Sequence, residues 1–166
     1  TDYLYTGETK GSKKAAATAA GVAVSLKHAL ARLRLNISTD RPEYTADSYP
    51  VLQSIGFTTR EGQTGTMDLQ TGDITSDNPD TGTSVSSDYR NEASPLNLIP
   101  GTPGIQKDYL LLPYGHETIS ALRRLTFSIK EPDGSEKDIV VFDEAYAGAN
   151  TPPLIVLEAG SITTLN

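Results

Sequence analysis

VAVSLKHALARLRLNI, residues 22–37, is the stretch that decides the fold class of this chain. If the stretch is read as a strand, its apolar side chains in the first half lie on the same face as His28. In the second half they lie on the opposite face, with Leu35. A strand that changes its inward face needs a bulge or a short turn at the change. The pattern therefore predicts two strand segments, 22–26 and 33–38, joined by a bulge or a single helical turn at 28–32, with His28 facing the core or its boundary.

The same stretch would also place apolar side chains along one face of a helix, so its periodicity alone leaves both structures open. The rest of the chain favours strands, because short apolar runs alternate with turn signals at intervals of about 8 to 12 residues. We therefore predict an all-β sandwich or barrel, with room for a short helical turn near 28–32. A single domain is expected at residues 22–166, preceded by a linker or leading strand at 1–21.

The second half of the chain carries the most regular strand pattern. Leu125, Phe127 and Ile129 alternate with polar residues, and EPDG at 131–134 is a strong turn signal before a return strand at 139–142. This pattern predicts a hairpin. Further strands are expected at 51–59, 66–71, 154–158 and 161–166.

Two connections follow from turn chemistry and polarity. EGQTG at 61–65 predicts a hairpin turn between the strands at 51–59 and 66–71, and a second turn is expected at 71–73. The polar stretch at 76–94 has almost nothing to bury, so it is predicted to be a mobile loop or a long connection.

Composition excludes several classes of function. The 166 residues include no cysteine and carry a formal net charge of −7. Disulfides, thiolate catalysis and cysteine metal sites are therefore excluded, and phosphate backbones would be repelled. Lys10, Lys13 and Lys14 lack aromatic neighbours for base stacking, so they are interpreted as a solvated basic tail and no nucleic-acid partner is expected. The sequence shows no signal peptide or transmembrane run.

No motif for catalysis, cofactor binding or metal binding is present, so no such site residue is predicted. His28 lacks co-ligands, and His116 lies in a turn where Glu117 would face away. The acidic residues at 68, 73, 77 and 80 miss the spacing of a calcium loop and are interpreted as solvated loop acids. We predict that the protein is not an enzyme; a hydrolase has the least support because nothing selects a carboxylate pair.

Short motifs follow one another along the chain: DYLY at 2–5, VxLxHALAxLxLxI at 24–37, SIGF at 54–57, MDLQTGDI at 67–74, LIP at 98–100 and LEAG at 157–160. This order resembles the carboxy-terminal domain of the fimbrillin family, the Mfa-like and FimA-like fimbrial subunits and anchors of anaerobic gut and oral bacteria. The resemblance spans nearly the whole chain.

The resemblance implies a transthyretin-like Greek-key β-sandwich of about seven strands that is the carboxy-terminal domain of a longer two-domain protein. It also implies a non-enzymatic fimbrial subunit or adhesin at the bacterial cell surface and outer membrane. Its partners would be other fimbrial subunits. Membrane attachment would come only through a lipid anchor on the full-length precursor.

In the family that the chain resembles, subunits polymerise by strand exchange, which is a form of β-augmentation. We predict that this domain either offers an open strand edge or lacks a strand that a partner or a further carboxy-terminal segment supplies. The candidate exchange segment is the last strand: Ser161, Ile162, Thr163, Thr164, Leu165 and Asn166. The alternative function is a secreted or surface module that binds carbohydrate or another host ligand. In that case exposed tyrosines in loops, Tyr44, Tyr49 and Tyr89, would contact the ligand.

Overall fold

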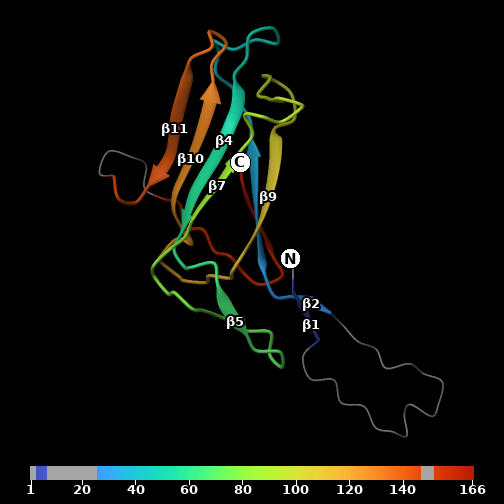
Figure 1. Ribbon diagram of the computed structural model, residues 1–166, viewed down its shortest axis with the longest axis vertical. Coiled ribbons are helices and arrows are strands. Elements are labelled where there is room, and N and C mark those ends of the chain that lie inside the picture. Colours follow the sequence, from blue (N-terminus) through green and yellow to red (C-terminus); the bar gives the residue numbers. More distant parts are fainter. Residues whose placement is uncertain (1–2, 7–25, 147–151) are drawn as a thin grey trace, which may run out of the picture.

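The computed structural model describes residues 3–6, 26–146 and 152–166. Across these residues the secondary structure is all-β, with twelve strands and no helix. Figure 1 shows long strands in two layers, with short strands at the lower end beside the N-terminus. The predicted all-β class is confirmed. The transthyretin-like topology and the boundary at residues 21 and 22 stay predictions.

The first layer is a three-stranded sheet with the order β12 (Ile162–Leu165), β3 (Ala31–Ile37) and β9 (Ile105–Leu111). β9 runs antiparallel to β3, whereas β12 runs parallel to it. Every second side chain of β3, beginning with Ala31, is buried. This is the two-residue period of a strand with one face in the core, and it confirms the predicted inward parity of 33–37.

The second layer is a five-stranded sheet. Its main path is β11 (Glu136–Asp143), β10 (Leu122–Lys130), β4 (Val51–Thr59) and β7 (Ser84–Asp88). β8 (Leu96–Asn97) pairs with the first residues of β4. All of these pairings are antiparallel, and β4 and β10 form the centre of the layer.

The predicted hairpin at 125–142 is confirmed by β10 and β11. The last pair of the ladder is Lys130 and Glu136. The turn between them is closed by backbone hydrogen bonds from Gly134 to the Glu131 carbonyl and from Glu131 to the Ser135 carbonyl. Gly134 has a φ of 90°, a left-handed conformation that glycine adopts without steric cost. The turn signal in the sequence therefore described the local backbone correctly.

Two short ribbons lie outside the layers. One pairs β1 (Leu4–Tyr5) with β2 (Lys27–His28), and the other pairs β5 (Gly65–Met67) with β6 (Ile74–Ser76). The predicted turn at 71–73 is confirmed. The predicted hairpin between 51–59 and 66–71 is wrong, because β5 pairs with the strand that follows it rather than with β4.

The break in the opening stretch is present, but its details differ from the prediction. The chain bends at Ala29 and Leu30, and the described residues there form no helical turn. Ala29 is buried, whereas His28 is exposed, so the expected inward position of His28 is wrong. His28 pairs with Leu4 in a ribbon outside the sandwich and has no core to face. Residues 22–25 lie outside the described residues, and Leu26 is exposed.

Two further assignments are corrected. The polar stretch at 76–94 contains β7, which pairs with β4 through backbone hydrogen bonds and turns only Val85 and Ser87 inward. A strand at the edge of a sheet can form with little apolar content because the backbone supplies the pairing. The predicted strand at 154–158 is absent. Leu157 instead makes an isolated bridge with Tyr114 and is buried.

The core lies between the two layers. Phe57 of β4 meets Tyr109 of β9 edge to face, with ring centroids 4.9 Å apart, which joins the layers directly. The largest fully buried apolar side chains come from both layers and from the segment before β12: Leu33, Leu35, Leu52, Ile55, Leu122, Ile155 and Leu157.

Leu33→Ala is expected to lower the free energy of unfolding by about 3 kcal/mol, because it leaves a cavity between the layers. Urea denaturation measures the change. Leu69→Ala is the matched control, since Leu69 is 77% exposed, and it should change the stability by less than about 0.5 kcal/mol. Equal losses in the two variants would contradict the placement of β3 in the core.

Candidate functional site

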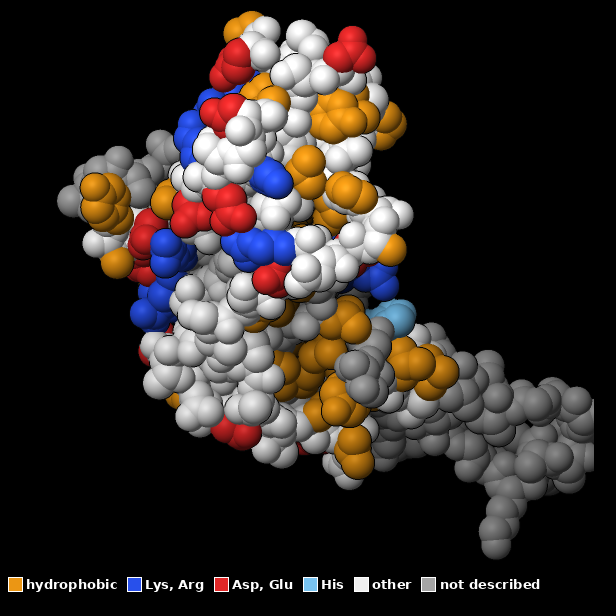
Figure 2. All heavy atoms as spheres, turned by 45° about the horizontal axis from the view of Figure 1, so that its top comes forward, with side chains coloured by type: hydrophobic (Ala, Val, Ile, Leu, Met, Phe, Trp, Pro, Cys, Tyr) orange, Lys and Arg blue, Asp and Glu red, His pale blue; other side chains and the backbone are white. Residues whose placement is uncertain are grey.

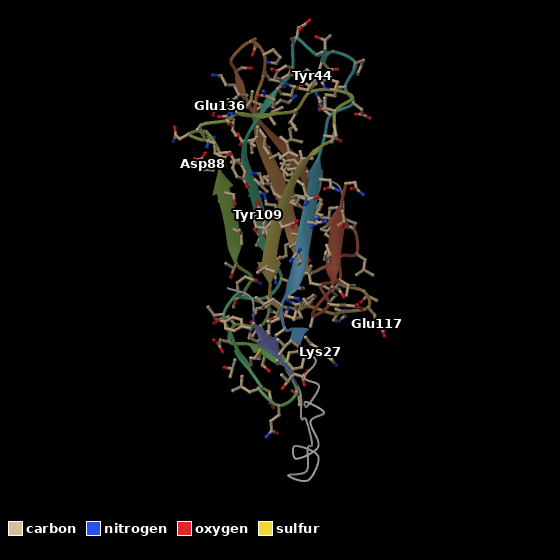
Figure 3. The ribbon with its side chains drawn as sticks, turned by 90° about the vertical axis from the view of Figure 1, so that its right-hand side faces the viewer. Lys27, Tyr44, Asp88, Tyr109, Glu117 and Glu136 are labelled. Atoms are coloured by element: carbon tan, nitrogen blue, oxygen red, sulfur yellow. The ribbon has the colours of Figure 1, made fainter. Side chains whose placement is uncertain are left out.

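Strand edges of both layers are left unpaired at two sides of the sandwich. Among the described residues, the sheet orders end at β11 and β12 on one side and at β7 and β9 on the other. Figure 3 looks onto the three-stranded sheet, with β12 at one margin and β9 and β7 at the other. An unpaired edge presents backbone N–H and C=O groups that can pair with another chain. Strand addition is therefore geometrically available at two places.

The side between β11 and β12, here called the open side, contains a groove with a volume of about 370 Å³. A second hollow of about 290 Å³ shares part of the same wall and extends toward the loop after β3. The groove is lined mainly by apolar side chains: Leu35, Ile37, Leu125, Phe127, Val141 and Leu165. The open side thus combines free strand edges with accessible apolar surface.

The predicted exchange segment, Ser161 to Asn166, forms β12 at the margin of the open side. Leu165 turns inward and lines the groove, whereas Ile162 points outward and is 51% exposed. The Thr163 hydroxyl donates to the carbonyl of Val156 at 2.7 Å, and the Asn36 amide donates to Asn166 at 2.8 Å. The strand prediction is confirmed, and its role in exchange stays a prediction.

The side between β7 and β9, here called the closed side, is bridged by side chains. The hydroxyl of Tyr109 lies 3.2 Å from that of Tyr89 and 3.3 Å from Ser87, so β9 is tied to β7 and to the residue after it. Figure 3 shows Tyr109 between β7 and β9. Burial raises the pKa of the Tyr109 hydroxyl above its usual value. The closed side therefore favours a neutral phenol that links the two layers.

The raised pKa of Tyr109 predicts a loss of stability in alkali. The folded state holds the phenolic proton more tightly than the unfolded state, so its stabilising effect is complete below pH of about 10 and declines above it. Tyr109→Phe should cost about 1 kcal/mol at neutral pH and should flatten the alkaline decline. Urea denaturation across this pH range measures both effects.

Tyr146→Phe serves as the control, because Tyr146 is 68% exposed. It should leave the alkaline decline unchanged. A decline that persists fully in Tyr109→Phe would show that another group is responsible.

The loop tyrosines do not form the exposed set that the binding-module alternative needs. Tyr44 is only 9% exposed, and its hydroxyl donates to the Glu131 carboxylate at 2.8 Å. Tyr89 is half-buried against Tyr109, and Tyr49 is also half-buried. The exposure that the binding-module alternative required is therefore reduced at all three rings, and Tyr44 and Tyr89 are held by contacts within the molecule.

The residues considered for metal binding are dispersed. Asp68 accepts hydrogen bonds from the backbone N–H groups of Gln70 and Thr71, which makes it a turn residue. His116 accepts a bond from the backbone of Thr118. Within the described ranges, no group of three or more His, Asp or Glu side chains could hold a metal ion. Lys10, Lys13 and Lys14 lie outside those ranges.

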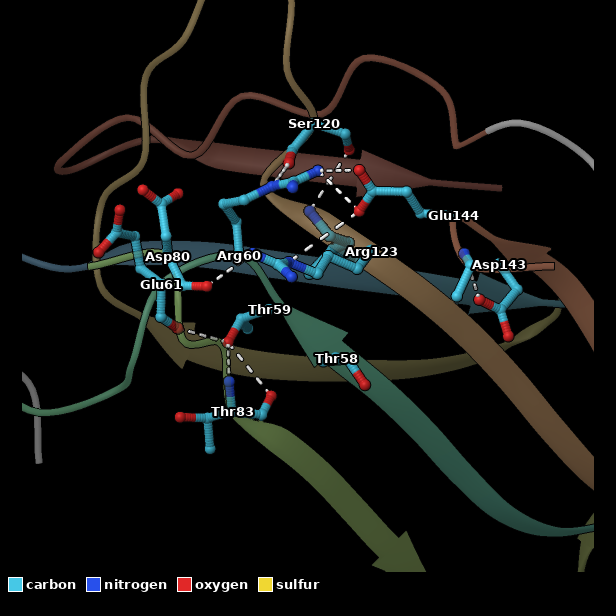
Figure 4. Close-up of polar contacts among 12 residues, drawn as sticks. Thr58, Thr59, Arg60, Glu61, Asp80, Thr83, Ser120, Arg123, Asp143 and Glu144 are labelled. Carbon is cyan, nitrogen blue, oxygen red and sulfur yellow. Dashed lines mark hydrogen bonds and ion pairs between the residues drawn. The ribbon is translucent and has the colours of Figure 1, made fainter. Parts of the chain in front are cut away.

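A polar cluster that sequence reasoning missed lies where β4 ends beside β10 and β11 (Figure 4). Arg60 donates to Glu144 at 2.9 Å and to the carbonyl of Ser120, and Arg123 donates to the carbonyl of Asp80 at 2.7 Å. The residues come from four distant parts of the chain, so no local motif could reveal them. The two guanidinium groups hold together the end of β4, the segment before β10 and the residue after β11, so we interpret these contacts as structural.

The end of the molecule near the N-terminal ribbon is rich in exposed apolar side chains. Tyr3, Leu4 and Leu26 are each about half exposed, at 54%, 49% and 57%. Figure 2 shows hydrophobic side chains in this lower part of the surface, beside a histidine. No helix among the described residues is long and apolar enough to cross a membrane.

The fold and the open side define a class of module: a β-sandwich with apolar surface between unpaired strands. A family profile described as fimbrillin-like matches residues 1–166. Three solved chains also match. One of them, from Bacteroides uniformis, is named for a candidate role in cell adhesion and is 17% identical, with a TM-score of 0.40. The match covers 86% of this chain and 47% of that one, so this chain spans about half of that protein's length. A search of curated proteins gave no match.

Because the family profile covers the whole sequence, the chain belongs to the fimbrillin-like family. Fimbrillins are structural, non-enzymatic proteins of bacterial surface filaments. Membership in this family supports a fimbrial component of the bacterial cell surface.

Proposed function

We propose that the protein is a fimbrial subunit that assembles by strand exchange on its open side. The segment from Ser161 to Asn166 leaves its own sheet and adds to the corresponding edge of a neighbouring subunit. The observation that carries the proposal is the apolar groove between β11 and β12, whose wall includes Leu165 of the exchanging strand. Backbone pairing supplies affinity in such an arrangement, and inward side chains supply specificity.

The attachment of β12 supports its role as the exchanged strand. It is four residues long, pairs with one strand and runs parallel to it, which gives slightly weaker pairing than an antiparallel ladder. Leaving the parent domain would uncover Leu35 and Leu125 at the groove, so a second copy of the strand would find the same apolar wall. Exchange of an identical element preserves the native contacts and therefore costs little free energy.

The position of the domain within the filament forms part of the same proposal. Residues 22–166 are the carboxy-terminal sandwich, and residues 1–21 connect it to a preceding domain. A lipid anchor on the precursor attaches the assembly to the outer membrane. These statements are supported by family membership, and immunogold labelling of filaments on cells that express the full-length protein tests them.

Exchange can be detected with cysteines introduced into this cysteine-free chain. Thr164 of β12 lies opposite Arg34 of β3 in the parallel register. A mixture of Thr164→Cys and Arg34→Cys proteins should form a disulfide-linked heterodimer on oxidation, because only exchange brings β12 of one copy beside β3 of another.

Mixing Thr164→Cys with Lys130→Cys is the control, and this pair should remain unlinked because Lys130 belongs to the other layer. The double variant in one chain verifies that the two cysteines can bond. Internal closure of the double variant without any heterodimer in the mixture would refute exchange of β12.

The two faces of β12 provide a second prediction. Leu165→Asp should reduce exchange strongly, by roughly tenfold or more in the linked fraction, because the groove would receive a carboxylate without a partner. Ile162→Asp is the matched control on the same strand, since Ile162 faces solvent, and it should leave exchange nearly unchanged. Equal effects at both positions would contradict an inward role for Leu165.

A further inference from the structure

We propose that Lys107 guards the free edge of β9, so that strand addition is prevented on the closed side and confined to the open side. This proposal rests on the proposed assembly by strand addition, and it states which side of the sandwich is used. Two sides of the sandwich carry unpaired edges, yet a filament needs one defined mode of contact. A residue that disfavours one edge supplies that selectivity.

Lys107 belongs to the inward row of β9. The strand alternates regularly, with Gln106, Asp108 and Leu110 exposed on the outer face and the residues between them partly or fully buried. Lys107 is thus a charged side chain that points inward from an edge strand. Natural sheets use this arrangement to prevent pairing between edges, because an added strand would enclose the charge.

The surroundings of the ammonium group show what enclosure would cost. Its nitrogen lies 4.2 Å from the centroid of the Tyr89 ring, a cation–π contact at the margin of the closed side. Among the described residues, no carboxylate lies within 4.0 Å of it. A strand added to β9 would remove water from this ammonium without supplying an opposite charge, which is strongly unfavourable.

The outer face of β9 would not provide the same protection. Asp108 accepts two hydrogen bonds from the guanidinium of Arg34, at 2.8 Å and 3.0 Å, so its charge is already compensated within the sheet. Leu110 is 42% exposed and apolar, which would favour contact with another chain. The inward ammonium of Lys107 is therefore the feature of β9 that opposes pairing.

On the open side no charged side chain among the described residues lines the groove. Lys137, which lies opposite Ile129 near the start of β11 and so shares its inward row, is exposed and does not line the groove. The residues of β11 that line the groove are Val141 and Phe142, joined by Ile139 in the adjoining hollow, and the lining residues of β12 are likewise uncharged. An extended segment can therefore cover the groove between β11 and β12 without enclosing an ion, whereas the adjoining hollow is also lined by Asp40 and Arg41. The groove and the free edge of β9 thus differ in the cost of desolvating a charge.

The test detects pairing between the β9 strands of two copies directly. In an antiparallel pair of two β9 strands centred on Asp108, Gln106 of one copy lies opposite Leu110 of the other. The variant Gln106→Cys with Leu110→Cys therefore reports this pairing as a disulfide-linked dimer. Within one copy the two positions are roughly 13 Å apart along the strand, too far for an internal disulfide.

Adding Lys107→Val to this double-cysteine protein should raise the linked dimer by roughly tenfold. Lys107→Arg keeps the charge and should remain at the background level. Lys130→Val, on β10, whose two edges are both paired, removes an exposed lysine elsewhere and should also remain at background. Lys107→Gln is uncharged and similar in length to lysine, so it should also raise the amount of linked dimer. It replaces Lys107→Val if the valine variant folds poorly.

Background levels of the dimer in both folded Lys107→Val and folded Lys107→Gln would overturn the guard role. An equal rise in Lys130→Val would overturn it as well, because a general loss of charge would then explain the result. The heterodimer between positions 164 and 34 is measured in parallel. Its absence counts against the proposed function, whereas the β9 disulfide reports on Lys107 alone.

Discussion

The packing of the inward row of β3 against the inner face of the second layer is the interaction on which the rest of the structure depends. Leu33 and Leu35 are completely buried, and they share one core with Leu52, Ile55 and Leu125 of the opposite sheet. Burial of apolar surface of this kind is the dominant favourable term in folding. β3 and β4 have a neighbouring strand on each side, so other strands form the edges of the two sheets.

The margins that result differ chemically although both expose strand edges. At the closed side, Tyr109 and Tyr89 join the layers through their hydroxyl groups, and the ammonium of Lys107 sits over an aromatic ring. At the open side, apolar walls face a groove, and the strand nearest to it is short and pairs in parallel. If strand addition occurs only at the open side, as we propose, the subunits associate in one defined direction. Membership in the fimbrillin-like family gives this asymmetry a biological setting.

Sequence reasoning was accurate where the signal is local. The alternation in 33–37 and the turn at 131–134 each depend on neighbouring residues, and the structure confirms both. It failed where distant segments decide the outcome. β7 forms in a polar stretch because β4 offers backbone partners, and His28 is exposed because its short strand pairs with β1 outside the sandwich. Tyr44 and Tyr89, which looked available for a ligand, instead contact Glu131 and Tyr109, residues far away in the sequence.

The sequence by itself determined the all-β class, the inward face of β3, the main hairpin, the strand at the carboxyl end and the resemblance to fimbrillins. These follow from side-chain periodicity, turn chemistry and the order of motifs along the chain. Only the tertiary structure decided that β12 lies parallel to β3, that the groove opens between β11 and β12, and that Lys107 meets Tyr89 at the other margin. Each of these features joins residues far apart in sequence, and their meeting depends on how the sheets stack rather than on any local preference.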